Sequence, residues 1–148
     1  NVAYRYGKVR IEDFGLFDDS DRPSNMLMKK NPFKIKLKVR FLKDVEHPIF
    51  TYTFKNVRGV DITGTNTMFE RVDVELAKAG EVYEVTFAQK AMMQGGEYMM
   101  SFSCTGFENG EFVVHQRLYD ITKVAIVSEQ DTVGFFDLDS KVTVEKLQ

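Results

Sequence analysis

The chain has 148 residues and a formal net charge of −2 at pH 7. Its lysines and arginines are spread along the sequence and form no basic block, which argues against a nucleic acid partner because phosphate backbones are bound by clustered cations. No apolar run approaches the roughly 18 residues of a membrane-spanning helix and no signal-peptide pattern opens the chain, so we expect no direct insertion into a membrane.

The length corresponds to one domain, residues 1–148, and a chain of this size buries about 68–70% of the surface that its unfolded form exposes. The single cysteine, Cys104, excludes an internal disulfide and favours the cytoplasm. We expect Cys104 to be a small apolar core residue. Because the sequence begins with Asn1 and not with methionine, we also expect it to be a fragment of a longer protein.

Apolar and polar residues alternate along the first half of the chain, which is typical of strands with one buried face. The clearest case is FKIKLKVRFL at residues 33–42, where lysines and an arginine occupy the face opposite to the apolar residues. A first strand is predicted over residues 9–16, with a bulge where the parity changes between Ile11 and Phe14. A third strand over residues 50–54 buries its aromatic side chains.

The next segment, ITGTNTMF at residues 62–69, contains a run of small hydroxyl and amide side chains that adds nothing to a core. Two interpretations are open at this point. The segment is either a polar strand at a working surface or a turn. Its small side chains either leave room for a ligand or satisfy nearby backbone groups.

Period-two alternation continues in the second half of the chain. It favours a strand over one helical turn at residues 72–76, and it predicts half-buried strands at residues 83–87 and 98–102. Residues 112–127 form a long strand that must be interrupted, because its apolar positions do not keep one parity. A last short strand is predicted at residues 142–144.

Turn residues separate these segments and set the fold class. Gly59, Gly80 and Gly95-Gly96 lie between predicted strands, and Asn109-Gly110 is the signal for a type I′ hairpin. Seven to nine short antiparallel strands in a chain of this size predict an all-β protein, a two-layer β-sandwich with Greek-key connections. A closed barrel is the alternative.

Signatures of catalysis and of metal binding are missing from the sequence. It contains no phosphate-binding loop, nucleophile elbow, zinc-protease motif or pair of C-x-x-C motifs, and it has only two histidines. The acidic cluster Asp18, Asp19 and Asp21 lacks the glycine and glutamate of a calcium loop and is more typical of an ordinary loop. Ser101, His115 and Asp120 could be drawn as a catalytic triad, but most β-sandwiches contain three such residues by chance. We therefore expect no enzymatic activity, no metal and no cofactor in this domain.

One candidate binding surface follows from strand parity. If the buried side chains of their strand are among Val114, Gln116 and Leu118, then His115 and Arg117 point to solvent. They would lie beside the outward-facing residues of the preceding strand. The alternative is a merely solvated face. The candidate ligand-binding residues are Thr51, Thr53, Asn66, Ser101, Ser103, His115, Arg117 and Tyr119. Tyr119 and Phe69 are the better-placed rings for stacking on a ligand.

Several short motifs follow one another along nearly the whole chain. They are Tyr6-Gly7, Val9-Arg10-Ile11, Asp13, Pro32, Phe33 to Phe41, Asp44, Pro48-Ile49-Phe50, Phe54, Gly59, Gly64-Thr65-Asn66-Thr67, Ala79-Gly80-Glu81, Gly96-x-Tyr98, Asp120, Val124, Ile126 and Gly134. Their order and spacing resemble the C-terminal domain of Wzt, the nucleotide-binding subunit of ABC transporters that export O-antigen and related cell-surface polysaccharides.

The resemblance implies an immunoglobulin-like β-sandwich that acts as a non-catalytic carbohydrate-binding module. Such a module recognises the exported polysaccharide, typically at its non-reducing end, and is attached to an ABC ATPase domain that works with a transmembrane permease. It implies a cytoplasmic location at the inner face of the plasma membrane. It also implies a homodimer, in some members formed by exchange of the C-terminal strand, which residues 141–147 match here. The alternative function is a protein-interaction β-sandwich that contacts a partner subunit.

Overall fold

The computed structural model describes residues 7–148, and this part of the chain contains ten strands and no helix. Tyr6, which opens the first motif, lies outside the described residues. The strands are β1 (Val9–Phe17), β2 (Met26–Met28), β3 (Pro32–Phe41), β4 (Val45–Glu46), β5 (Ile49–Asn56), β6 (Asp61–Asn66), β7 (Leu76–Ala77), β8 (Val82–Lys90), β9 (Gly96–Glu108) and β10 (Glu111–Val127).

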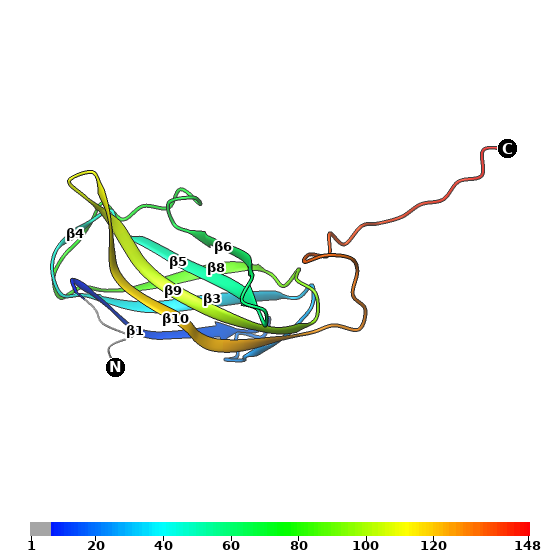
Figure 1. Ribbon diagram of the computed structural model, residues 1–148, viewed down its shortest axis with the longest axis horizontal. Coiled ribbons are helices and arrows are strands. Elements are labelled where there is room, and N and C mark those ends of the chain that lie inside the picture. Colours follow the sequence, from blue (N-terminus) through cyan, green and yellow to red (C-terminus); the bar gives the residue numbers. More distant parts are fainter. Residues whose placement is uncertain (1–6) are drawn as a thin grey trace.

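The long strands form two layers (Figure 1). One sheet has the order β1-β3-β8, the other has the order β2-β10-β9-β5-β6, and β4 and β7 form a small separate pair. The chain crosses between the layers from β1 to β2, from β2 to β3, from β3 to β5, from β6 to β8 and from β8 to β9. All pairs are antiparallel except β2 with β10. The predicted all-β sandwich is confirmed.

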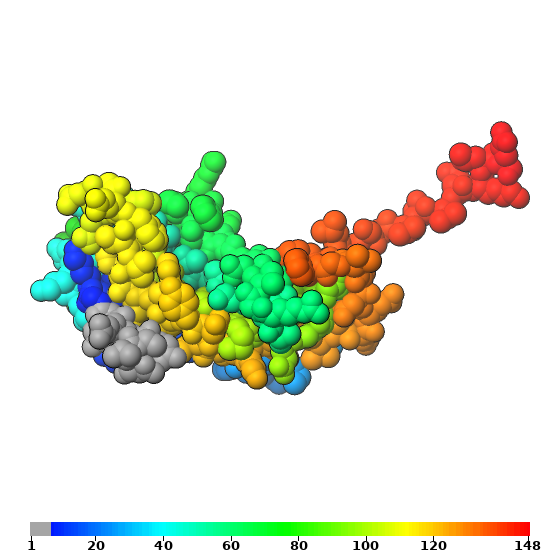
Figure 2. All heavy atoms as spheres, viewed as in Figure 1, coloured from blue at the N-terminus to red at the C-terminus, as the bar shows by residue number. Residues whose placement is uncertain are grey.

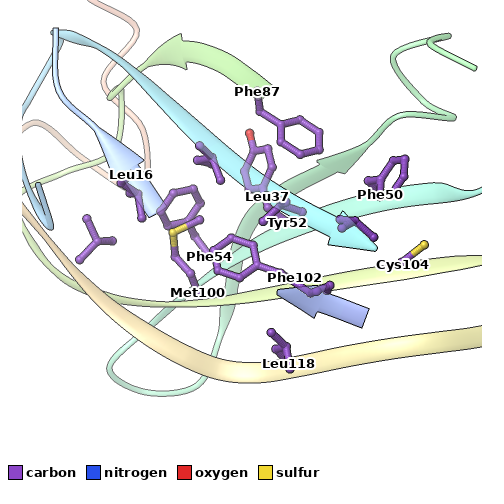
Figure 3. Packing of buried hydrophobic residues seen from close by; sticks show 14 of the residues in the cluster. Leu16, Leu37, Phe50, Tyr52, Phe54, Phe87, Met100, Phe102, Cys104 and Leu118 are labelled. Carbon is purple, nitrogen blue, oxygen red and sulfur yellow. The ribbon is translucent and has the colours of Figure 1, made fainter. Parts of the chain in front are cut away.

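The core lies between the two layers, where the apolar residues of the alternating patterns meet. Ile35, Leu37 and Val39 of β3 are fully buried, as the alternation in residues 33–42 predicts. Phe54 of β5 reaches across to Phe33 of β3, with ring centroids 6.4 Å apart in an edge-to-face arrangement. Figure 3 shows the packing of this cluster.

Cys104 belongs to the same core, as predicted. Its side chain is fully buried, and burial raises the pKa of the thiol to about 12. A thiol with so high a pKa remains protonated at neutral pH and is a poor nucleophile. Cys104 therefore fills space between the sheets.

Two irregularities shift side chains between the faces of the strands. The predicted bulge in β1 is present, between Ile11 and Asp13. Beside it, the backbone N–H of Ile11 donates a hydrogen bond to Gln116 Oε1 at 2.6 Å, which joins β1 to β10 across the two layers. The predicted interruption of β10 is also present, as two register shifts in its pairing with β9, between Val114 and Gln116 and between Leu118 and Thr122.

The β9–β10 hairpin turns through the two predicted residues. Asn109 and Gly110 both have positive φ, 53° and 78°. The strands resume pairing at Glu108 and Glu111 directly on either side. Two successive residues with positive φ define the type I′ turn, so this prediction is confirmed.

Two predicted strands are wrong or much shorter than expected. Of residues 72–76, only Leu76 joins a strand, the two-residue β7, because residues 71–75 have no neighbouring strand to pair with. Residues 142–144 form no strand. They belong to an extended tail that leads away from the sandwich, so its backbone groups have no strand partner within residues 7–148 (Figures 1 and 2).

A polar cluster holds the chain where this tail leaves the body. The side chain of Lys29 is only 5% exposed, and its Nζ lies 2.8 Å from Asp137 Oδ2 and donates to Gln94 Oε1 and to the backbone oxygen of Gln130, both at 2.9 Å. Asp137 N–H in turn donates to the backbone oxygen of Met92. A buried ammonium group needs such partners because it has lost its hydration shell.

Replacing Lys29 with methionine is expected to lower the urea midpoint at pH 7 and to change its dependence on acid. The hydrogen bond from Lys29 holds the pKa of Asp137 below its ordinary value near 3.8, so the stabilisation is present above that value and is lost as pH falls through the lower folded-state pKa. The midpoint difference should therefore shrink below about pH 4. Lys123→Met, at an exposed lysine 3.9 Å from Glu97, is the control and should show little difference at any pH.

Candidate functional site

The outward face of the five-stranded sheet carries a polar row that crosses four strands. Thr51 of β5 lies opposite Asn66 of β6 on one side and opposite Ser103 of β9 on the other. Ser103 in turn lies opposite Arg117 of β10. Directly opposed residues on a sheet share one face, so these four predicted residues point the same way.

A second polar row lies beside the first. Thr53 of β5 is opposite Gly64 of β6 and Ser101 of β9. On β10 the row meets the bulge between Leu118 and Thr122, where Tyr119 is more than half exposed. The two rows line a shallow hollow of about 240 Å³ that includes Arg117 and Tyr119.

Arg117 contributes a cation to this surface, and Tyr119 supports it. Its guanidinium lies 5.6 Å from the centre of the Tyr119 ring, and Nη1 donates a hydrogen bond to the Tyr119 hydroxyl at 3.1 Å. Stacking of this kind limits the motion of the long side chain. Arginine carries five N–H donors, so others remain to bind a ligand.

His115 does not belong to this surface, and its predicted exposure is wrong. The residue is 7% exposed, and its ring lies beside Gly106. The register shift between Val114 and Gln116 makes His115 the extra residue of a bulge, so parity no longer predicts its direction. Burial lowers the pKa of its imidazole, which is therefore uncharged at neutral pH. Ser103 faces the hollow but is also largely covered by its neighbours.

Residues 62–69 are a strand in their first part and a turn in their second. Residues 61–66 form the edge strand β6, and the chain then turns through residues 67–71. Asn66 ends the strand and accepts a hydrogen bond from Phe69 N–H at its Oδ1, 2.7 Å away, so one side of its amide stabilises the turn. Phe69, one of the two rings expected to stack on a sugar, lies in this turn and is mostly exposed.

Gly64 is required by the close approach of β6 to β5. A Cβ at this position would lie 2.6 Å from the Tyr52 backbone oxygen and 2.9 Å from Thr53 Cγ2. Both distances are too short for carbon, and the first contact is with backbone that cannot easily move. The absence of a side chain also keeps the second polar row open at this strand.

Sequence reasoning missed Asp120 and Lys55 as members of the surface. Asp120 has a φ of 45° within the bulge, and its N–H donates to Ser101 Oγ at 2.8 Å. Lys55 Nζ lies 3.8 Å from Asp120 Oδ1. The loss of parity between Leu118 and Thr122 was the signal available in the sequence, because it indicates a bulge at this point of the strand. It does not show which side chain the bulge turns outward.

The rejected chemical sites are also not assembled among the described residues. Ser101 and Asp120 are neighbours, but no interaction within residues 7–148 joins either to His115. No group of three or more histidine, cysteine or acidic residues in that range could hold a metal. Asp18 uses one carboxylate oxygen to accept the N–H groups of Ser20 and Arg22, as in an ordinary loop.

Comparison with known proteins gives a family and a fold. The sequence model described as the Wzt C-terminal domain matches residues 2–138. A crystal structure of the C-terminal domain of Wzt superposes with a TM-score of 0.87 at 21% identity, covering 97% of this chain and 92% of that chain.

A more distant match shares only the sandwich fold. It is the crystal structure of a Niemann-Pick type C2 protein from Japanese carpenter ant, with a TM-score of 0.51 and 9% identity, covering 83% of this chain and 96% of that chain. A search of curated proteins found no match. Within residues 7–148, there is no helix with the length and apolar character needed to cross a membrane.

Proposed function

The chain belongs to the Wzt C-terminal domain family, and from this we propose that it is a non-catalytic carbohydrate-binding module of a polysaccharide exporter. Its ligand is the exported glycan, an O-antigen-like polymer read at its non-reducing end. Its work is recognition, which it couples to transport by the ABC ATPase domain and the transmembrane permease. This places the domain in the cytoplasm, at the inner face of the plasma membrane.

The observation that carries the proposal is the pair of polar rows on the outward face. Threonine and serine hydroxyls, the Asn66 amide and the Arg117 guanidinium lie across four neighbouring strands with register-fixed spacing. Sugars are held by such hydroxyl, amide and charged groups together with a ring against their C–H face, which Tyr119 offers. A shallow hollow suits a polymer because the glycan can enter and leave at the sides of the hollow.

Titration of the domain with the surface polysaccharide of the source organism tests this function. Two-dimensional NMR should show shifts of backbone amides in β5, β9 and β10 around the two rows. Calorimetry should give saturable binding. An absence of binding at millimolar glycan concentration would refute the proposal.

A second candidate function is contact with a protein partner, and one observation favours it. Phe107 and Phe112 at the tip of the β9–β10 hairpin form an edge-to-face pair with centroids 5.7 Å apart, and both are more than half exposed. Phe107 borders a hollow of about 440 Å³ that also contains Met68 and Val72. Exposed apolar patches of this kind mark interaction surfaces. The pair lies outside the two polar rows, so glycan binding and partner binding are separable by mutation.

We also propose that the domain is a homodimer formed through its C-terminal tail. Val142, Val144 and Leu147 are each at least 80% exposed on an extended segment that leads away from the body (Figure 2). Such residues gain burial when the tail adds as a strand to a second copy.

Deletion of residues 141–148 is expected to convert a dimer into a monomer. Light scattering at micromolar concentration measures the mass of both forms, and the exposed double replacement of Lys141 and Lys146 by alanine is a control that keeps the apolar residues. A full-length chain with monomeric mass would contradict the exchanged strand.

A further inference from the structure

A groove runs along the open side of the sandwich, between the edge strands β6 and β8. No strand bridges the two sheets here, because β6 ends one sheet and β8 ends the other. The groove has a volume of about 460 Å³, which lies in the range of roughly 300–1,000 Å³ found for ligand pockets. Its wall is formed by apolar residues of β8 and by Tyr52 of β5.

Tyr52 offers an unpartnered hydroxyl to this groove. The residue is 7% exposed, and its ring packs edge-to-face on Phe87 of β8 with centroids 5.0 Å apart (Figure 3). Within residues 7–148 the hydroxyl makes no hydrogen bond. Every fully enclosed polar side-chain atom in that range has a partner, so the Tyr52 hydroxyl must be accessible to solvent. It therefore borders the groove. Because this hydroxyl is accessible from the groove and has no protein partner among the described residues, it is available to hydrogen-bond a ligand.

Glu70 places a carboxylate at the same groove. The residue lies in the turn after β6, and its Oε2 accepts a hydrogen bond from Thr65 Oγ1 at 2.6 Å. Burial raises the pKa of the Tyr52 hydroxyl, and the negative charge of the nearby Glu70 raises it further. A carboxylate accepts several hydrogen bonds, so the one from Thr65 leaves acceptor capacity for a ligand.

Building on the proposed function, we propose that the groove between β6 and β8 is a second sugar-binding subsite, in which Tyr52 and Glu70 bind the hydroxyls of a saccharide unit. Phe87 and Val85 supply an apolar wall for its C–H face. Strand β6 connects the two subsites: Asn66 points to the polar rows on the outward face, and the neighbouring Thr65 points into the groove. A glycan that crosses the edge of β6 reaches both.

The polar groups in the groove favour a sugar over an added β-strand. A strand paired with β8 would turn alternate side chains inward, and in the register that turns Val142 and Val144 of the C-terminal tail inward, these residues would face the Tyr52 hydroxyl and the Glu70 carboxylate. Neither group would gain a hydrogen bond, and both would be further desolvated. A saccharide presents hydroxyls and an apolar ring face together, which matches both parts of the wall.

The test compares Tyr52→Phe with Tyr83→Phe in the full chain. Tyr83 borders the same groove, but its hydroxyl already donates to Glu81 Oε1 at 3.1 Å, so its removal is the matched control. The probes are fragments of the surface polysaccharide of the source organism, from one sugar to about eight. The readout is NMR shifts of amides in β6 and β8, separated from those in β9 and β10.

The expected result is that longer fragments shift both sets of amides. Tyr52→Phe should then lose the β8 shifts and weaken the longest fragment by about fivefold, while the β9 and β10 shifts stay and Tyr83→Phe behaves like the parent. Shifts confined to the outward face at every length would overturn the groove subsite and leave the proposed function intact. No shifts anywhere would overturn both. A synthetic peptide of residues 139–148 that shifts β8 when the glycan does not would assign the groove to the tail of a second copy.

Discussion

Replacing Arg117 with alanine is expected to weaken binding of the native polysaccharide at least tenfold and to leave the fold intact. Arg117 contributes a cation to the two polar rows and is stacked on Tyr119, so it presents its donors at a fixed position. A hydrogen bond from a charged group contributes about 1.5–3 kcal/mol, and about 1.4 kcal/mol corresponds to a factor of ten in affinity. Calorimetry with the surface polysaccharide measures the change.

A matched control separates this local effect from a general loss of positive charge. Lys38 lies on the outward face of β3, in the other sheet, and is exposed. Lys38→Ala removes one positive charge in the same way and should bind the polysaccharide as the parent does. Equal affinities of the parent and Arg117→Ala, with unchanged urea midpoints, would show that the outward face of the five-stranded sheet is not the binding surface.

Replacing Phe54 with alanine is expected to lower the free energy of unfolding by about 3–5 kcal/mol, the range for deleting a large aromatic side chain from a packed core. Phe54 is 1% exposed and contacts rings of both sheets, Phe33 on β3 and Tyr52 on β5 itself. Its loss leaves a cavity between the layers that the two hydrogen-bonded sheets cannot close. Urea denaturation followed by circular dichroism measures the change.

Phe112→Ala is the control for the Phe54 variant, because it removes the same side chain from the exposed hairpin tip. Phe112 is 56% exposed, so its replacement should cost less than about 1 kcal/mol. Similar losses for the two variants would mean that the interface between the sheets is not the main source of stability.

The two proposed subsites place different demands on the same edge strand. Strand β6 contributes Asn66 to the outward face and Thr65 to the groove, and it approaches β5 closely because Gly64 has no side chain. A short polar strand with a glycine can serve both surfaces, since only Ile62 at its start is buried in the core and residues 64–66 add no apolar side chain to it. This gives a physical reason for the sequence GTNT at a position where a sandwich would otherwise place apolar residues.

The sequence by itself determined the layers and the face of most candidate residues. Period-two alternation fixes which side chains of a strand can be buried, because successive residues of a strand point to opposite faces. Residues 33–42 and 50–54 follow this rule, and Thr51, Thr53 and Ser101 therefore lie on the outward face as predicted. The Asn109-Gly110 turn was equally predictable, since it depends on the two local residues that tolerate positive φ.

Only the tertiary structure decided which residues the bulges redirect and which strands lie at the edges. The shift after Val114 buries His115, and the shift after Leu118 turns Asp120 outward, because a bulge depends on how two strands pair and not on one strand alone. Residues 142–144 alternate like a strand but have no neighbouring strand in the described part of the chain. The groove beside Tyr52 exists because β6 and β8 both end their sheets, and that order is set by the packing of the whole sandwich.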